Sequence, residues 1–199
     1  PPRSTLFPTR RSSDLTNANE QYLAVALMAT GRPVYMRVDM KEHNQRTPKR
    51  SPSLMHIRAG ADERGKLVGV EATCWIDHGP CSESANDLTN KSGQFFFSPY
   101  AYDNMRVTAY TVWTNHRWSS AFRAYGSPQI YWGTETAMDM LAYECGMDPF
   151  DFREQNLLEW EPFTENPRGQ FPSGYAPEVF PLPEMMKKAR PVYEEMNVG

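Results

Sequence analysis

Residues 121–129 read Ala-Phe-Arg-Ala-Tyr-Gly-Ser-Pro-Gln, and this stretch predicts a loop that leads into a helix. Gly126 permits backbone conformations that other residues rarely adopt, Ser127 is a favourable helix N-cap, and Pro128 is a favourable first helical residue. The helix is expected to run to about residue 145, because apolar residues recur on one of its faces: Ile130, Ala137, Met138, Leu141 and Cys145.

The same stretch predicts an anion-binding site. A loop that enters a helix in this way directs free backbone N–H groups and the positive end of the helix dipole toward whatever lies before it. Arg123 adds a planar set of donors that suits an oxyanion or a heterocycle. Helix starts of this kind are common, so an ordinary structural role is the alternative.

Strands are expected upstream of this loop. Runs of apolar, β-branched and aromatic residues indicate strands at 34–40, 54–59, 67–76 and 105–113. The second and third of these are joined around Asp62-Glu63-Arg64-Gly65, which is typical of a hairpin turn. The basic stretch 41–53 is expected to be a loop or an exposed edge.

Further helices are expected at 19–31, at 149–157 with Asp148 as its cap, and from about residue 183. Pro191 should kink or interrupt the last of them. The proline-rich stretch 160–181 is expected to be an extended loop. Together these elements predict an α+β fold, with a mixed or antiparallel sheet covered by helices.

Composition limits the kind of protein. The chain has 199 residues, 40% of them hydrophobic and 13% aromatic, so it is expected to fold as one domain or as a piece of a larger one. Its net charge of -3 argues against nucleic acid as a partner, and no apolar run approaches the roughly 20 residues that cross a bilayer. Three cysteines without a metal-binding pattern (Cys74, Cys81 and Cys145) fit a cytoplasmic location, with the periplasm as the alternative.

The sequence from Ala121 to Gln129 resembles a cofactor loop of the molybdenum hydroxylases, the family of xanthine dehydrogenase and aldehyde oxidoreductase. Other segments resemble the large subunit of that family in the same order: 29–34, 49–52, 77–80, 139–142, 146–149, 177–180 and 182–185. The resemblance runs from about residue 17 to the C-terminus and is strongest to bacterial aldehyde oxidoreductases. Residues 17–199 are therefore expected to form part of the first molybdopterin-binding domain.

Residues 1–16 do not fit this resemblance. They contain three prolines and a cluster of basic residues without a matching apolar face. We expect a foreign or disordered tail, and translated sequencing-adapter sequence explains it better than a natural flexible terminus.

The resemblance implies molybdopterin, in a dinucleotide form, as the cofactor, and the hydroxylation of an aldehyde to a carboxylic acid with water as the oxygen source. The family's general-base glutamate and iron–sulfur clusters are expected outside this chain, so it should hold no catalytic residue and no metal ligand and be inactive by itself. Expected partners are a small aldehyde or heterocycle, an iron–sulfur domain or subunit, and a second copy in a homodimer. The alternatives are a purine-type hydroxylase of N-heterocycles and a non-catalytic binding or scaffold domain.

Five residues are assigned to cofactor binding by this resemblance: Ala121, Phe122, Arg123, Ala124 and Tyr125. Their backbone amides and the Arg123 side chain would hold the polar edge and the phosphate region of the pterin. Ala124 stands where many relatives have glycine, which puts a very close approach of the backbone there in question.

The substrate channel is expected to include Tyr125, which matches an aromatic position near the metal. Counting back from Arg123 without gaps places Ser84, Asp87 and Lys91 at other channel positions, the first two of which are bulky and apolar in aldehyde oxidoreductases. The channel is therefore expected to be more polar than in those relatives. Alternatively, a shift of register leaves Ser84, Asp87 and Lys91 on a solvated loop.

Overall fold

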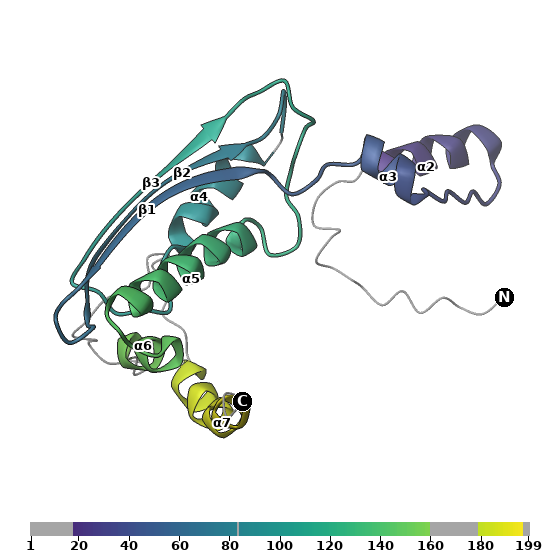
Figure 1. The fold of residues 1–199 in the computed structure, drawn as a ribbon. Coiled ribbons are helices and arrows are strands. Elements are labelled where there is room, and N and C mark those ends of the chain that lie inside the picture. Colours follow the sequence, from purple (N-terminus) through teal and green to yellow (C-terminus); the bar gives the residue numbers. More distant parts are fainter. Residues whose placement is uncertain (1–17, 83, 160–178, 197–199) are drawn as a thin grey trace.

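The computed structural model of the protein describes residues 18–82, 84–159 and 179–196, which form helices and one three-stranded sheet (Figure 1). The expected tail at 1–16 and most of the expected loop at 160–181 lie outside the described residues. In chain order the elements are α2 (Ala18–Thr30), α3 (Met40–Arg46), β1 (Ser53–Ala61), β2 (Leu67–Asp77), α4 (Ala85–Phe95), β3 (Asn104–Val112), α5 (Ser127–Glu144), α6 (Pro149–Asn156) and α7 (Leu182–Met196). The predicted α+β fold is confirmed.

The sheet is mixed. β1 and β2 form the predicted antiparallel hairpin, and β3 pairs with β2 in parallel, so the strand order is β1-β2-β3. Asp62 organises the hairpin turn, because its carboxylate accepts hydrogen bonds from the amides of Arg64 at 2.9 Å and Lys66 at 2.8 Å. Since partners across a sheet share a face, the register sets Cys74 on the covered face and Trp75, which stacks on Tyr110, on the open face.

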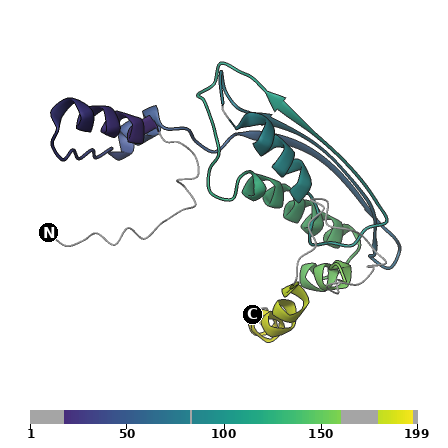
Figure 2. The ribbon, with the colours of Figure 1, turned by 180° about the vertical axis from the view of Figure 1, so that it is seen from behind.

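Helices α4 and α5 cover one face of the sheet, as the two opposite views show (Figures 1 and 2). Small residues allow the close contact. A Cβ on Gly133 of α5 would lie 2.8 Å from the sulfur of Met55 in β1, and a Cβ on Gly93 of α4 would lie 3.5 Å from the Cβ of Ala109 in β3. Helices α2 and α3 lie to one side of this two-layer body.

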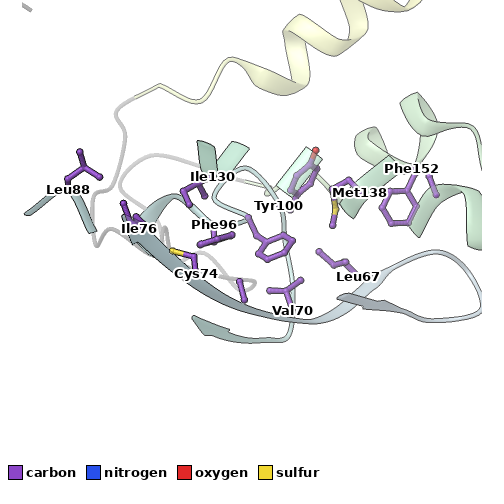
Figure 3. Packing of buried hydrophobic residues seen from close by; sticks show 13 residues of the cluster. Leu67, Val70, Cys74, Ile76, Leu88, Phe96, Tyr100, Ile130, Met138 and Phe152 are labelled. Atoms are coloured by element: carbon purple, nitrogen blue, oxygen red, sulfur yellow. The ribbon is translucent and has the colours of Figure 1, made fainter. Parts of the chain in front are cut away.

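The hydrophobic core fills the space between the sheet and the helices (Figure 3). Its side chains come from β2, from the helices α4, α5 and α6, and from the turns that follow α4. They include Leu67, Cys74, Ile76, Leu88, Phe96, Ile130, Met138 and Phe152. The predicted apolar face of α5 is confirmed, because Ile130 and Met138 are fully buried.

The N-terminal part of the chain corrects the sequence-based expectation. The predicted strand at 34–40 is absent from the described residues, and α3 occupies part of the predicted loop at 41–53. The helix begins with a capping box: Asp39 Oδ1 accepts from the Glu42 amide at 2.7 Å, and Glu42 Oε2 accepts from the Asp39 amide at 3.3 Å. This reciprocal pairing stabilises a helix start in a polar stretch.

Helix boundaries downstream give one more correction. Gly126, not Ser127, is the N-cap of α5, and the Ser127 hydroxyl donates back to the Ala124 carbonyl at 2.6 Å. Asp148 caps α6 as predicted, since its carboxylate accepts from two amides of the first turn. Pro191 lies inside α7 and does not interrupt it.

Candidate functional site

The loop 121–126 connects the segment after β3 to the first turn of α5. Its last three residues, Ala124, Tyr125 and Gly126, have φ angles of 70°, 45° and 93°. Left-handed backbone costs a non-glycine residue roughly 1–2 kcal/mol. Two successive non-glycine residues in this region therefore mark a loop whose shape is imposed by the contacts around it.

Several carbonyl groups of this loop accept hydrogen bonds inside the protein. The Tyr125 amide donates to the Phe122 carbonyl at 2.8 Å, and the Ala124 carbonyl accepts from the Ser127 amide at 3.0 Å. Residues 122–125 thus form a hydrogen-bonded turn. Since Ala124 has a positive φ and Arg123 does not, the turn is of type II.

The amide groups of the loop, in contrast, are available. Among the described residues, the amides of Phe122, Arg123 and Ala124 make no hydrogen bond, and all three residues are exposed. The Arg123 side chain is exposed and likewise has no hydrogen bond or ion pair within the described ranges. Successive free amides in a turn form a concave anion site, and the N-terminus of α5 adds its positive dipole end.

Arg50 holds the loop from one side. This half-buried residue precedes β1, and its Nη2 donates to the Arg123 carbonyl at 2.8 Å, while its Nη1 donates to Gln129 Oε1 at 3.1 Å. Its guanidinium carbon also lies 4.8 Å from the centroid of the Phe122 ring. Gln129 in turn donates to the Ser51 carbonyl at 3.1 Å. The segment before β1 is therefore fastened to both the loop and α5.

Ser84 holds the loop from the other side. It is only 6% exposed, and its Oγ lies 2.9 Å from the Oγ of Ser120 and accepts a hydrogen bond from the Ala121 amide at 3.3 Å. The Ser120 amide donates to the Lys49 carbonyl at 3.2 Å. The entry to the loop is thus fixed between α4 and the segment that carries Arg50.

Three of the predicted channel residues, Ser84, Asp87 and Lys91, lie on α4 or at its N-cap and not on a loop. Ser84, Asp87 and Lys91 share one helical face because three and four residues separate them. Tyr125 lies next to this face. Burial raises the pKa of its hydroxyl, the hydrogen bond with Ser84 opposes this effect, and the charge of Asp87 raises the pKa further. The Tyr125 hydroxyl is therefore protonated at neutral pH and serves as a donor.

The segment that leads from β3 to the loop is held by Asp77, at the end of β2. Its Oδ1 accepts from the Gly79 amide at 2.8 Å and the Thr114 hydroxyl at 2.7 Å, and its Oδ2 lies 2.6 Å from His116 Nδ1. Burial alone would raise the pKa of the Asp77 carboxyl, but these three partners hold it below its usual value. Asp77 thus pairs with His116, and not with the neighbouring His78.

Neither a metal-binding cluster of side chains nor a membrane-spanning helix is found in the part of the chain that the structure describes. No group of three or more histidine, cysteine, aspartate or glutamate side chains there could hold a metal ion. Across the same residues, no helix has the length and apolar character needed to cross a membrane.

Comparison with known proteins identifies the family. Residues 16–157 match the model of the molybdopterin cofactor-binding domain. The chain belongs to this family. It is 44% identical over 176 residues to the aldehyde oxidoreductase of Megalodesulfovibrio gigas, and the match covers 88% of this chain and 19% of that protein. It is also 33% identical over 135 residues to the large molybdopterin subunit of nicotinate dehydrogenase from Eubacterium barkeri, covering 68% of this chain and 32% of that subunit.

Solved structures agree with this molybdopterin-binding assignment. The crystal structure of the aldehyde oxidoreductase from Desulfovibrio desulfuricans superposes with a TM-score of 0.77 at 40% identity, covering 91% of this chain and 19% of that one. The chain thus spans about one fifth of the length of the aldehyde oxidoreductases that it matches.

The structure brings the five predicted cofactor-binding residues together in one loop and sets Ser84, Asp87 and Tyr125 side by side, with Lys91 one turn further along α4. It adds Arg50, to which the sequence assigned no role because 73 residues separate it from Arg123. The only signal was that residues 49–52 resemble the family.

Proposed function

We propose that this chain forms part of the cofactor site of a molybdenum-dependent aldehyde oxidoreductase, which hydroxylates aldehydes to carboxylic acids with water as the oxygen source. The observation that carries the proposal is the loop 121–126, in which successive free amides and an arginine without a partner among the described residues lie just before the N-terminus of α5. The 44% identity to an aldehyde oxidoreductase supports the choice of reaction.

The loop fits molybdopterin, which we expect in a dinucleotide form. A pterin ring and its phosphates offer acceptors, and the loop offers matching donors: the amides of Phe122, Arg123 and Ala124, and the guanidinium of Arg123. When bound, the molybdenum cofactor supplies the redox chemistry. The residues of this chain bind and orient it, and their fixed dipoles need no rearrangement during the reaction.

The substrate is proposed to lie near Tyr125, between the loop and α4. The Tyr125 hydroxyl orients a polar group of the substrate as a hydrogen-bond donor, with Asp87 and Lys91 as charged groups on the adjacent helix face. Ser84 is buried, so its contribution is to hold Tyr125 and the loop entry in place. Electrons are proposed to leave through an iron–sulfur domain or subunit, and a homodimer is the proposed assembly.

Hydroxylation of an N-heterocycle is the second candidate. The similarity to the nicotinate dehydrogenase subunit favours it, because nicotinate is a heterocyclic carboxylate and Lys91 offers a cation to such a group. We prefer aldehyde oxidation as the proposed reaction, since the sequence identity to the aldehyde oxidoreductase is higher and extends over more of the chain.

A segment exchange tests the proposal. The matching 176-residue segment of the Megalodesulfovibrio gigas enzyme is replaced by that of this chain, and molybdenum content, benzaldehyde oxidation and nicotinate oxidation are measured. We expect a cofactor-loaded enzyme that prefers benzaldehyde, in which Arg123→Ala lowers molybdenum content without lowering the unfolding temperature. A preference for nicotinate would select the second candidate. Equal molybdenum content with and without the Arg123→Ala change would contradict the role of Arg123, and an exchanged enzyme without molybdenum would favour a scaffold domain. The 199-residue chain by itself is expected to be inactive.

A further inference from the structure

The peptide between Arg123 and Ala124 has the orientation that its residues favour least. It is the central peptide of the turn 122–125, and a flip of this peptide interconverts type II and type I turns. Type II demands a positive φ at the third residue, which glycine accepts and alanine resists. Ala124 nevertheless has a φ of 70°.

Arg50 makes the contact that accounts for this orientation. Its Nη2 donates to the Arg123 carbonyl, the oxygen that a flip would turn away. The guanidinium is held in place by its second bond, to Gln129, and by the Phe122 ring that it faces. Because a trans peptide is planar, its carbonyl and its N–H point in opposite directions. Directing the Arg123 carbonyl toward Arg50 therefore directs the Ala124 N–H away from Arg50, among the free amides of the loop.

We propose that Arg50 is a positioning residue, which keeps the 123–124 peptide in the type II orientation and so presents the Ala124 amide to the anion. The nature of that anion rests on the proposed function, but the orientation of the peptide does not. Because alanine resists this orientation, the loop of this chain depends on Arg50. A glycine at position 124 would remove most of that dependence.

The first part of the test measures the orientation of the peptide in the 199-residue chain. The sign of φ at residue 124 is read by NMR from the HN–Hα coupling and the carbon chemical shifts, in the parent and in Arg50→Ala, Arg50→Lys, Ala124→Gly and the Arg50→Ala/Ala124→Gly double variant. Arg58→Ala is the matched control, since Arg58 is exposed and, among the described residues, pairs with Glu71 alone across the open face of the sheet.

We expect φ of Ala124 to become negative in most molecules of Arg50→Ala and to stay positive in the Arg58→Ala control. Lysine keeps one donor but loses the planar fork, so Arg50→Lys should give a mixture of both orientations. The double variant should retain the type II turn. A positive φ at Ala124 throughout the Arg50→Ala population would overturn the proposal.

The second part uses inorganic phosphate as the probe. Phosphate should shift the amide signals of residues 122–126 in the parent, and Arg50→Ala should weaken this binding about tenfold. The unfolding temperature of Arg50→Ala should equal that of the Arg58→Ala control. A flipped peptide with unchanged phosphate affinity would overturn the positioning role. If phosphate shifts none of these amides in the parent, the proposed anion site fails, and the φ measurement still decides the role of Arg50.

Discussion

Gly126 and Ser92 are so close that a Cβ on Gly126 would lie 2.2 Å from the Ser92 Oγ. The same Cβ would lie 3.4 Å from the Leu88 carbonyl oxygen, so the end of the loop 121–126 rests directly on α4. This contact sets how near Tyr125, the residue before Gly126, lies to Ser84 and Asp87. Glycine at 126 is thus required both by the space beside α4 and by its φ of 93°.

Gly126→Ala should destabilise the chain by about 2–4 kcal/mol, because a left-handed alanine is strained and its methyl group meets the Ser92 hydroxyl. The free energy of unfolding in urea measures the effect. Ser92→Ala should be neutral or slightly stabilising by itself, because the Ser92 Oγ is buried without a partner among the described residues. In the double variant, Ser92→Ala should recover only the part of the unfolding free energy that the steric clash removed, because the strain of a left-handed alanine remains. A cost below about 1 kcal/mol for Gly126→Ala would show that α5 moves away easily.

Asn156 should be the most sensitive polar residue of the hairpin end of the sheet. It is 3% exposed; its Oδ1 accepts from the Leu67 amide at 2.8 Å, and its Nδ2 donates to the carbonyls of Gly65 at 2.8 Å and Phe152 at 2.9 Å. Asn156→Asp replaces this donor by a buried carboxylate oxygen facing two carbonyls, so we expect a loss of about 3 kcal/mol or more of unfolding free energy.

The neighbouring Gln155 is the control for Asn156. It donates to the adjacent carbonyl, that of Arg64, at 2.9 Å, but it is exposed. Gln155→Glu should therefore cost about 0.5 kcal/mol or less, because water replaces the lost bond. Similar losses for both variants in urea unfolding would mean that Asn156 does not hold α6 against the hairpin.

Stability should fall in mild acid because of His78. Its side chain is fully buried, and burial lowers its pKa below the usual 6.5, with only a partial opposing effect from Asp77. The imidazole therefore takes up a proton at a lower pH in the folded state than in the unfolded state. The contribution of neutral His78 to the free energy of unfolding is thus complete above pH 6.5, and it is lost as the pH falls from 6.5 toward the lower pKa of the folded state. The loss is at most about 1.4 kcal/mol per pH unit.

Urea unfolding between pH 7.5 and pH 5 is expected to show this slope in the parent and a flatter profile in His78→Gln, whose amide does not titrate but can keep the contact to Thr89. Asp77 provides the internal check. Its lowered pKa means that its contribution is lost only below its usual value of 3.8, outside this range. An unchanged slope in His78→Gln would assign the acid sensitivity to other groups.

The parts of the fold that the sequence predicted correctly are those in which local pattern and tertiary contacts agree. The hairpin of β1 and β2 alternates cleanly around a turn built on Asp62, and α5 carries a continuous apolar face. Helix α4 was missed because its sequence, Ala-Asn-Asp-Leu-Thr-Asn-Lys-Ser-Gly-Gln-Phe, contains few good helix formers. It is helical because burial of residues such as Ala85 and Leu88 against the rest of the domain outweighs propensity.

Only those parts of the candidate site that are contiguous in the sequence could be predicted from it. The loop residues and Gly126 could be found in one contiguous motif, and Asp39 with Glu42 spells a capping box that points to α3. The strained φ angles of Ala124 and Tyr125 could not be predicted, because the side chains that hold the loop, Arg50 and Ser84, come from distant segments. Such contacts appear only when the sheet places the start of β1 beside the start of α5.

Substrate selection offers the last prediction, and the structure changes how it is tested. Introducing a large apolar side chain at Ser84 would displace Ser120 and the Ala121 amide, so that position does not report on the channel alone. Asp87 is exposed and acts electrostatically on Tyr125. It can therefore be changed without disturbing the loop.

In the segment-exchanged enzyme, Asp87→Leu should raise kcat/KM for benzaldehyde relative to an aldehyde of similar size that carries a cationic group. The carboxylate attracts the cation and disfavours an apolar ring, and its removal reverses both effects. A tenfold change in the ratio corresponds to about 1.4 kcal/mol of differential transition-state binding. Asp87→Asn separates charge from polarity, since it should lower the preference for the cation while changing benzaldehyde turnover less. An identical ratio in all three forms would mean that Asp87 does not face the substrate, and the channel would then be no more polar than in the aldehyde oxidoreductases.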